Sequence, residues 1–178
     1  MLAVLGVLLV ALVGGSVLWF TGRTGVPPVP SSAKEIADVV ALLRAAGLPE
    51  RPRIYELGCG FGGLALALAR AFPEATVVGL EVSPLPAAIA WLRARGEPRL
   101  TIHRMDYTQA ILGDADAATA YLMIRAAAEL APVLDVQLRP GTAVVASMFW
   151  FRDRTPTRKR GQAALYRWPA RGLGAEEP

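Results

Sequence analysis

The residues with the clearest chemical potential form a glycine-rich loop that follows a short apolar run. Four glycines occupy this loop within six positions: Gly58, Gly60, Gly62 and Gly63. Glycine tolerates a positive φ angle, and without a Cβ atom it lets the backbone pass close to a ligand. The helical pattern that begins at Gly63 would offer free N–H groups and the positive end of a dipole. The sequence therefore predicts a ligand-binding turn between a strand and a helix.

The glycine spacing is compatible with two kinds of ligand. Gly58, Gly60 and Gly63 satisfy the G-x-G-x-x-G pattern of dinucleotide-binding folds. Glu56, followed by glycine at every second position to Gly62, satisfies the acidic-x-G-x-G-x-G pattern of methyltransferases that use S-adenosylmethionine. A carboxylate at Glu56 would repel a pyrophosphate, but it could bind the cationic amino group of a methionine moiety. The acidic residue therefore favours the sulfonium cofactor.

Two further acids fall where the next apolar runs end. Glu81 follows the second run, about twenty residues after the loop, where a carboxylate can accept two ribose hydroxyls. Asp106 lies just past the third run, in HRMDYT, and is expected to accept a hydrogen bond from the adenine amino group. A dehydrogenase would usually need a second domain, for which the chain has no room. The predicted cofactor-binding residues are Glu56, Gly58, Cys59, Gly60, Gly62, Glu81 and Asp106.

The elements that must position these residues alternate between strand and helix, as in a parallel sheet with helices on both faces. Strands are predicted at residues 53–57, 76–80, 100–103, 117–123 and 142–149. Helices are predicted at residues 32–46, 63–71, 84–95 and 125–138, and Pro132 should kink or break the last one. Residues 162–168 are predicted as a late edge strand after a loop at 152–161. The fold class expected is α/β.

The start of the chain has the features of a membrane anchor. Residues 2–20 read LAVLGVLLVALVGGSVLWF and contain no charge. As a helix they would reach about 28 Å, close to the hydrocarbon thickness of a bilayer. The bulky residues after the apolar core do not fit the cleavage site of a signal peptide, which is the alternative. The sequence therefore predicts a transmembrane helix at 1–21 and a proline-rich linker at 22–31.

The charges that follow this helix predict its orientation. The first charged residues, Arg23 and Lys34, come after the apolar segment, so residues 21–178 are expected in the cytoplasm. The net charge of +4 is concentrated in a basic segment at 152–178. Beside an anchor, its expected partner is an anionic lipid surface rather than nucleic acid, and a solvated tail remains the alternative. With only one cysteine and one histidine, the chain has neither an internal disulfide nor a Cys/His metal cluster.

Several segments resemble small class I methyltransferases that carry one N-terminal membrane helix. This group includes protein-lysine methyltransferases that act on the adenine nucleotide translocase and on the ATP synthase c subunit. The similar segments are VPPVPSS at 26–32, ELGCGFG at 56–62, GLEVSP at 79–84 and the helix that contains Trp91. The resemblance implies a Rossmann-like fold, S-adenosylmethionine as cofactor and methylation of a lysine.

The residues expected on the substrate side depart from the family pattern. Phe61 and Gly63 stand where the family usually has Asp and Arg, and Pro28 stands where an aromatic residue is common. The segment SMFWF at 147–151 is similar to C-R-F-P-F but lacks its arginine. Tyr121, at the carboxyl end of the fourth predicted strand, is the residue expected to orient the methyl acceptor.

The expected activity is methylation of a lysine on a membrane protein near the cytoplasmic surface, because a tethered domain meets such substrates at high effective concentration. Two alternatives remain open at this stage. The enzyme could methylate a lipid or another small molecule, or the chain could be a non-catalytic protein that keeps the fold. The sequence assigns no oligomeric state.

Overall fold

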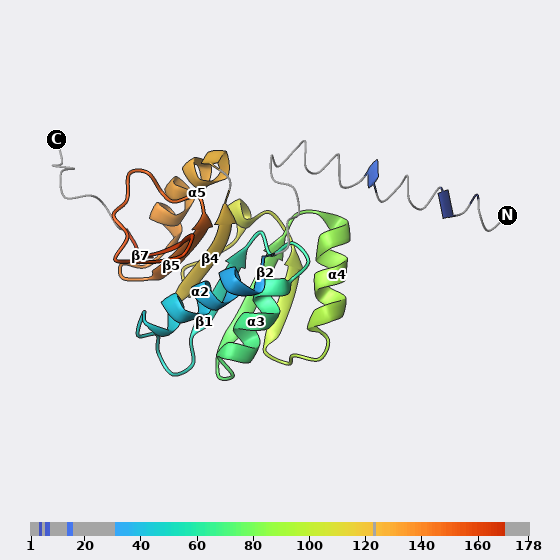
Figure 1. Cartoon of the computed structure of the whole chain (residues 1–178), viewed down its shortest axis with the longest axis horizontal. Coiled ribbons are helices and arrows are strands. Elements are labelled where there is room, and N and C mark those ends of the chain that lie inside the picture. The colour runs from blue at the N-terminus through green and yellow to red at the C-terminus, as the bar shows by residue number, and fades with distance from the viewer. Residues whose placement is uncertain (1–3, 5, 8–13, 16–30, 123, 170–178) are drawn as a thin grey trace.

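The computed structural model describes residues 4, 6–7, 14–15, 31–122 and 124–169 of the chain. Its centre is a seven-stranded sheet with the order β3-β2-β1-β4-β5-β7-β6 (Figure 1). The strands are β1 (Arg53–Leu57), β2 (Thr76–Glu81), β3 (Leu100–Arg104), β4 (Ala117–Leu122), β5 (Ala143–Met148), β6 (Arg158–Arg160) and β7 (Ala163–Arg167). The first five run parallel, and β7 pairs antiparallel with both β5 and β6. The described part therefore has a mixed sheet with one C-terminal hairpin.

Helices cover both faces of this sheet. On one face lie α2 (Ala33–Arg44), α3 (Gly63–Ala71) and α4 (Pro84–Ala94). On the other face lie α5 (Ile124–Gln137) and the segment at 110–115, which precedes β4. The central strands carry buried residues on both sides, and this accounts for their nearly continuous apolar sequences. The carboxyl ends of β1 to β5 consequently meet at one edge of the sheet.

Local sequence signals account for the starts of the first two helices. The Ser32 hydroxyl accepts a hydrogen bond from the Glu35 N–H at 3.3 Å, and the Glu35 carboxylate accepts one from the Ser32 N–H at 2.7 Å. Ser32 and Glu35 thus form a capping box, for which their S-x-x-E spacing is typical. Helix α3 begins instead after Gly62, which has a left-handed backbone and provides no side-chain cap. The glycine loop therefore leads directly into the first turn of α3.

The strands and helices lie where the sequence predicts them, within one or two residues at their ends. Of the kink or break predicted at Pro132, the break is absent, because α5 runs through this residue. Because proline has no N–H, Pro132 donates no helical hydrogen bond to the Ala128 carbonyl. Both residues line a cavity.

The C-terminal part of the sheet differs from the prediction. The predicted late strand is present as β7, but it is not at the edge, because β6 pairs on its outer side. The predicted loop at 152–161 contains β6. The sheet thus continues into the basic segment at 152–178, and α2 packs on β7 and β6. An ion pair between Asp38 of α2 and Arg160 of β6, with Nε and Oδ1 2.8 Å apart, holds the hairpin to this helix.

The predicted transmembrane helix at 1–21 and the linker at 22–31 fall almost wholly outside the described residues. Within the described ranges, no helix combines the length and apolar character that crossing a bilayer requires.

Candidate functional site

Three of the predicted site residues extend from the same face of the sheet near its carboxyl edge. Glu56 in β1, Glu81 in β2 and Tyr121 in β4 each lie an even number of positions from a residue of the core beneath α2 and α3. Those reference residues are Ile54, Val77 and Ala117. Because side chains alternate along a strand, all three functional groups point toward the α2 and α3 side. The site therefore lies where the N-terminal ends of these helices meet the strand ends.

Glu81 ties the second strand to the glycine loop. Its Oε2 accepts a hydrogen bond from the Gly60 N–H at 2.9 Å, and its Oε1 accepts one from the Ser83 N–H at 2.7 Å. The residue is only 8% exposed. Each carboxylate oxygen has a second lone pair, so Glu81 can accept two further hydrogen bonds. The pair of oxygens therefore suits two neighbouring hydroxyl groups, such as those of a ribose.

Glu56 is a buried acid whose Oε2 atom has no hydrogen-bond partner among the described residues. Burial raises its pKa well above the ordinary glutamate value, the backbone N–H of Ala65 lowers it, and the negative charge of Glu81 raises it further. A bound cation would stabilise the ionised form of this carboxylate, because its positive charge would offset both the cost of burial and the repulsion from Glu81. The orphaned oxygen thus fits the cationic amino group of a methionine moiety.

The glycine loop uses most of its own N–H groups within the protein. Gly58 and Cys59 donate to the Leu80 carbonyl at 2.9 and 2.8 Å, and Gly62 donates to the Cys59 carbonyl at 2.8 Å. Because Gly60 donates to Glu81, none of these four groups is left to bind a phosphate. The loop is therefore poorly suited to a pyrophosphate, in agreement with the preference for a sulfonium cofactor.

Glycine is required in this loop for two separate reasons. Gly58, Gly60 and Gly62 have φ angles of 77°, 52° and 76°, which other residues rarely adopt. At Gly62 a Cβ atom would also lie 2.9 Å from the Cβ atom of Ala90 in α4. The loop is thus held against α4 as well as against β2.

Cys59 contributes backbone to the loop, while its thiol is buried against the sheet. A Cβ atom at Gly79 would lie 3.0 Å from its Sγ and 2.7 Å from the Cδ1 atom of Ile102. Burial raises the pKa of the thiol, and the charges of Glu56 and Glu81 raise it further. Cys59 is therefore a neutral packing residue rather than a nucleophile.

Asp106 follows the end of β3 beside Glu81. The N–H of Met105 donates to the Glu81 carbonyl at 3.0 Å, which places the next residue at the same edge of the sheet. The Oδ1 atom of Asp106 accepts hydrogen bonds from the N–H and hydroxyl of Thr108, at 2.9 and 2.8 Å. The structure thus places Glu56, Glu81 and Asp106 at three neighbouring strand ends, although no contact joins the Asp106 carboxylate to the other two.

Tyr121 lies on the far side of β1 from Glu81, opposite Ser147 of β5 in register. Burial raises the pKa of its hydroxyl, and the negative charge of Glu35 raises it further. The hydroxyl is therefore a neutral donor at physiological pH. Glu35, in the first turn of α2, is a residue near the site that the predicted site residues do not include.

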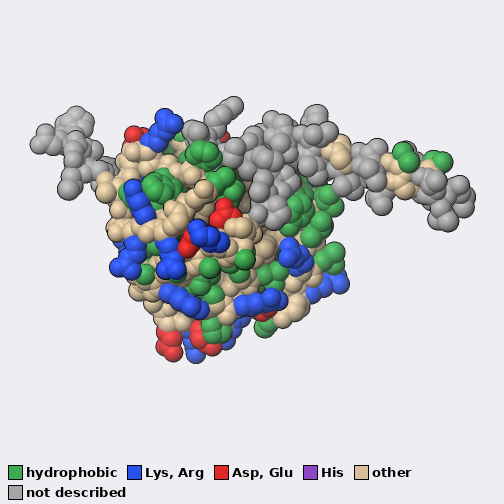
Figure 2. All heavy atoms as spheres, in the orientation of Figure 1, with side chains coloured by type: hydrophobic (Ala, Val, Ile, Leu, Met, Phe, Trp, Pro, Cys, Tyr) green, Lys and Arg blue, Asp and Glu red, His purple; other side chains and the backbone are tan. Residues whose placement is uncertain are grey.

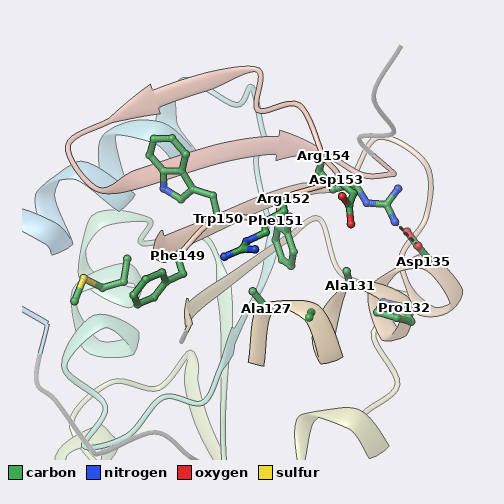
Figure 3. A pocket seen from close by; sticks show the side chains of 12 residues that line it. Ala127, Ala131, Pro132, Asp135, Phe149, Trp150, Phe151, Arg152, Asp153 and Arg154 are labelled. Atoms are coloured by element: carbon green, nitrogen blue, oxygen red, sulfur yellow. Dashed lines mark hydrogen bonds and ion pairs between the residues drawn. The ribbon is translucent and has the colours of Figure 1, made fainter. Parts of the chain in front are cut away.

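A cavity of about 750 Å³ opens beside the end of β5, between α5 and the segment at 148–154 (Figure 3). Its walls are Ala127, Ala131 and Pro132 of α5 and the aromatic residues Phe149, Trp150 and Phe151, with Arg154 and Asp135 paired at one end. Met148 has a φ angle of 71°, and Phe149 donates to the Ser147 carbonyl at 3.0 Å. This tight turn directs the chain from β5 into the cavity wall. None of the predicted cofactor residues lines the cavity.

The described residues contain no group of three or more His, Cys, Asp or Glu side chains that could hold a metal ion.

Sequence comparison relates the chain to methyltransferases. The description of the family whose profile matches residues 56–158, more than half of the chain, is "ANTKMT methyltransferase domain". A protein-lysine N-methyltransferase of Saccharolobus islandicus strain REY15A is 28% identical over 134 residues, covering 74% of this chain and 81% of that protein. A tRNA (guanine-N(7)-)-methyltransferase of Podospora anserina is 42% identical over 53 residues, but the match covers only 18% of that protein.

Structural comparison agrees with the sequence. A crystal structure of an RNA methyltransferase from Salinibacter ruber, in complex with S-adenosyl-L-homocysteine, has a TM-score of 0.69 and 28% identity. The match covers 84% of this chain and 97% of that one. A precorrin-6y C5,15-methyltransferase from Geobacter metallireducens has a TM-score of 0.56 at 14% identity, and this likeness concerns the fold alone.

Proposed function

The chain belongs to the ANTKMT methyltransferase domain family and is an S-adenosylmethionine-dependent methyltransferase, and we propose that it methylates a lysine side chain of a membrane protein. Its fold is the Rossmann-like α/β methyltransferase fold. The similarity to a protein-lysine N-methyltransferase over 74% of the chain supports a protein acceptor.

The proposed cofactor site rests on one observation, which is that two buried acids, Glu56 and Glu81, lie on either side of the glycine loop. When bound, S-adenosylmethionine supplies an electrophilic methyl group on a sulfonium. We assign the free Oε2 atom of Glu56 to the amino group of its methionine part, and Glu81 to the ribose hydroxyls. Asp106 is assigned to the adenine amino group. The backbone of Gly58, Cys59, Gly60 and Gly62 forms the turn between these groups.

The acceptor side is assigned to Tyr121 and Glu35. Glu35 brings a negative charge close to the Tyr121 hydroxyl, which suits a lysine that arrives as a cation. The lysine must lose its proton before it can attack, and transfer from water into a partly apolar pocket lowers the pKa of an amine. Tyr121 would then orient the neutral amine toward the methyl group.

The membrane location is supported by the sequence. An uncharged segment of bilayer length at 2–20 and a short proline-rich linker would hold the catalytic domain at the cytoplasmic surface. A lysine on an integral membrane protein, near the headgroups, would then be within constant reach.

A second candidate acceptor is RNA. It is favoured by the 28% identity to the Salinibacter ruber RNA methyltransferase, which extends over 97% of that chain. A lipid or other small acceptor would use the same cofactor site. The three classes of acceptor can therefore be distinguished only by identifying which kind of molecule becomes methylated.

Methyl transfer from tritium-labelled S-adenosylmethionine tests this function. The full-length chain is incubated with membranes, and protein, RNA and lipid are extracted separately. We expect label in membrane proteins, recovered as methyl-lysine after hydrolysis. Label that appears only in RNA or only in lipid would overturn the lysine acceptor.

Two site variants and a matched control make the result specific. At a cofactor concentration below the wild-type Kd, Glu81→Gln and Glu56→Gln should each strongly reduce the label, because each variant loses a carboxylate at the cofactor site. Glu74→Gln removes an acid whose side chain is 47% exposed and whose ion pairs, within the described part of the chain, are with Arg51 and Arg99. It should leave the label unchanged.

A further inference from the structure

Helix α4 turns an apolar face outward, against the usual pattern for a surface helix. Trp91 and Leu92 are 51% and 54% exposed, and Ala88 on the same side is also exposed. Pro84, Leu85 and Arg95 complete this side at helical spacing, and we call these six residues the α4 face. Figure 2 shows hydrophobic side chains gathered on the side of the molecule where Figure 1 places α4.

The charges at the end of α4 are all positive. Between Pro84 and Arg95 the chain has two arginines and no acid. Arg95 stacks on the ring of Trp91, with its Cζ atom 4.2 Å from the ring centroid. Arg93 donates from Nη1 to the Phe61 carbonyl at 2.9 Å and is itself exposed. The next acid, Glu97, is already paired with Arg70 at 2.8 Å.

We propose that the α4 face docks on an anionic lipid bilayer. A tryptophan with one apolar and one polar edge suits the headgroup region, where Leu92 can enter the hydrocarbon boundary. Arginine lays its apolar stem along such a surface and keeps its charge among the phosphates. Arg95 is positioned for this, because its guanidinium lies over Trp91 at the rim of the apolar residues.

The charge pattern favours lipid over a second copy of the chain. A two-fold contact through the α4 face would bring Arg95 of one copy near Arg95 of the other. No acid of α4 is available to pair with them. An anionic bilayer, in contrast, complements Arg95 and covers the exposed Trp91 and Leu92.

Quenching of Trp91 fluorescence by lipid tests the proposal without depending on methyl transfer. The full-length protein is mixed with vesicles of phosphatidylcholine, alone or with phosphatidylserine, that carry bromine on their acyl chains. The signal of Trp91 is obtained by subtracting that of the Trp91→Phe variant. We expect it to shift to the blue and to be quenched in the anionic vesicles, while little changes in the neutral ones.

A charge variant and its control complete the experiment. Arg95→Gln should lower the apparent affinity for anionic vesicles, measured by the quenching of Trp91, by about fivefold. Arg44→Gln, which removes an exposed arginine at the end of α2, should have no such effect. The proposal is overturned if Trp91 stays accessible to aqueous iodide in anionic vesicles, or is quenched equally in neutral ones. It is also overturned if raising the protein concentration buries Trp91 without lipid, because that result indicates a second copy.

Discussion

The Gly60 N–H donates a hydrogen bond to the carboxylate of Glu81, 21 residues further along the chain, at 2.9 Å. This bond joins the loop after β1 to the end of β2 before any ligand is present. Glu81 is therefore both a cofactor-binding candidate and the tie that fixes the shape of the loop. The two roles can be separated by comparing stability with cofactor affinity.

Glu81→Gln should lower both quantities. An amide has one acceptor oxygen, so either Gly60 or Ser83 would lose its partner and face an N–H₂ group. We expect the free energy of unfolding to fall by about 2 kcal/mol. Cofactor affinity, measured by calorimetric titration, should fall at least about tenfold. Denaturant unfolding measures the change in stability. A midpoint equal to that of the wild type would show that Glu81 does not stabilise the glycine loop.

Glu56→Gln should act in the opposite direction on stability. Burial raises the pKa of this carboxyl, so the unfolded chain releases its proton at a lower pH than the native protein does. Native stability of the wild type should therefore fall as pH rises from the ordinary glutamate pKa to the raised one. The variant lacks this fall and should be more stable above that range by about 1 kcal/mol, while binding the cofactor more weakly. Unfolding midpoints measured across pH check the sign, and parallel curves for the two proteins would refute it.

Gly62→Ala should destabilise the protein more than Gly58→Ala. Both positions have a positive φ angle, which costs alanine about 1 kcal/mol. Only at Gly62 would the new Cβ atom also collide with Ala90, at 2.9 Å. The additional variant Ala90→Gly should therefore recover part of the loss for Gly62→Ala and none for Gly58→Ala. A double-mutant cycle by thermal unfolding measures this, and equal recovery at the two sites would exclude the contact.

Tyr121→Phe and Glu35→Gln should affect the acceptor rather than the cofactor. Without its hydroxyl, Tyr121 cannot orient an amine, so kcat should fall about a hundredfold while the cofactor Kd is unchanged. Glu35→Gln keeps a side-chain acceptor for the capping box but loses the charge, and it should raise the KM for a lysine peptide. Kinetics with a lysine peptide separate the two effects. A changed cofactor Kd in either variant would place these residues on the wrong side of the site.

The arrangement of the three acids at one edge of the sheet could be predicted because its signals are local. Glu56, Glu81 and Asp106 each stand at or just after the end of a short apolar strand, and parallel strands bring such ends to one edge. The approach of Gly62 to Ala90 and the proximity of Glu35 to Tyr121 depend on how helices pack, which no local pattern contains. The close packing of Cys59 and Ile102 on Gly79 could have been predicted, because a glycine inside a strand often marks a close approach.

The C-terminal hairpin could be predicted only in part for a related reason. β7 has an apolar sequence, whereas β6 consists of three exposed basic residues with no strand pattern. β6 exists because β7 pairs with it on one side while pairing with β5 on the other. Such an insertion of a later strand between two earlier ones is decided by tertiary pairing.

The position of β7 also sets the order in which the sheet can close during synthesis. While the ribosome has released only the chain up to Phe151, β5 has no neighbour on its outer side, since β7 begins at Ala163. A nascent or prematurely terminated chain of this length presents buried-type residues on an open strand, which is a template for intermolecular pairing. The outer edge of β5 therefore becomes protected from intermolecular pairing only after β7 has been translated.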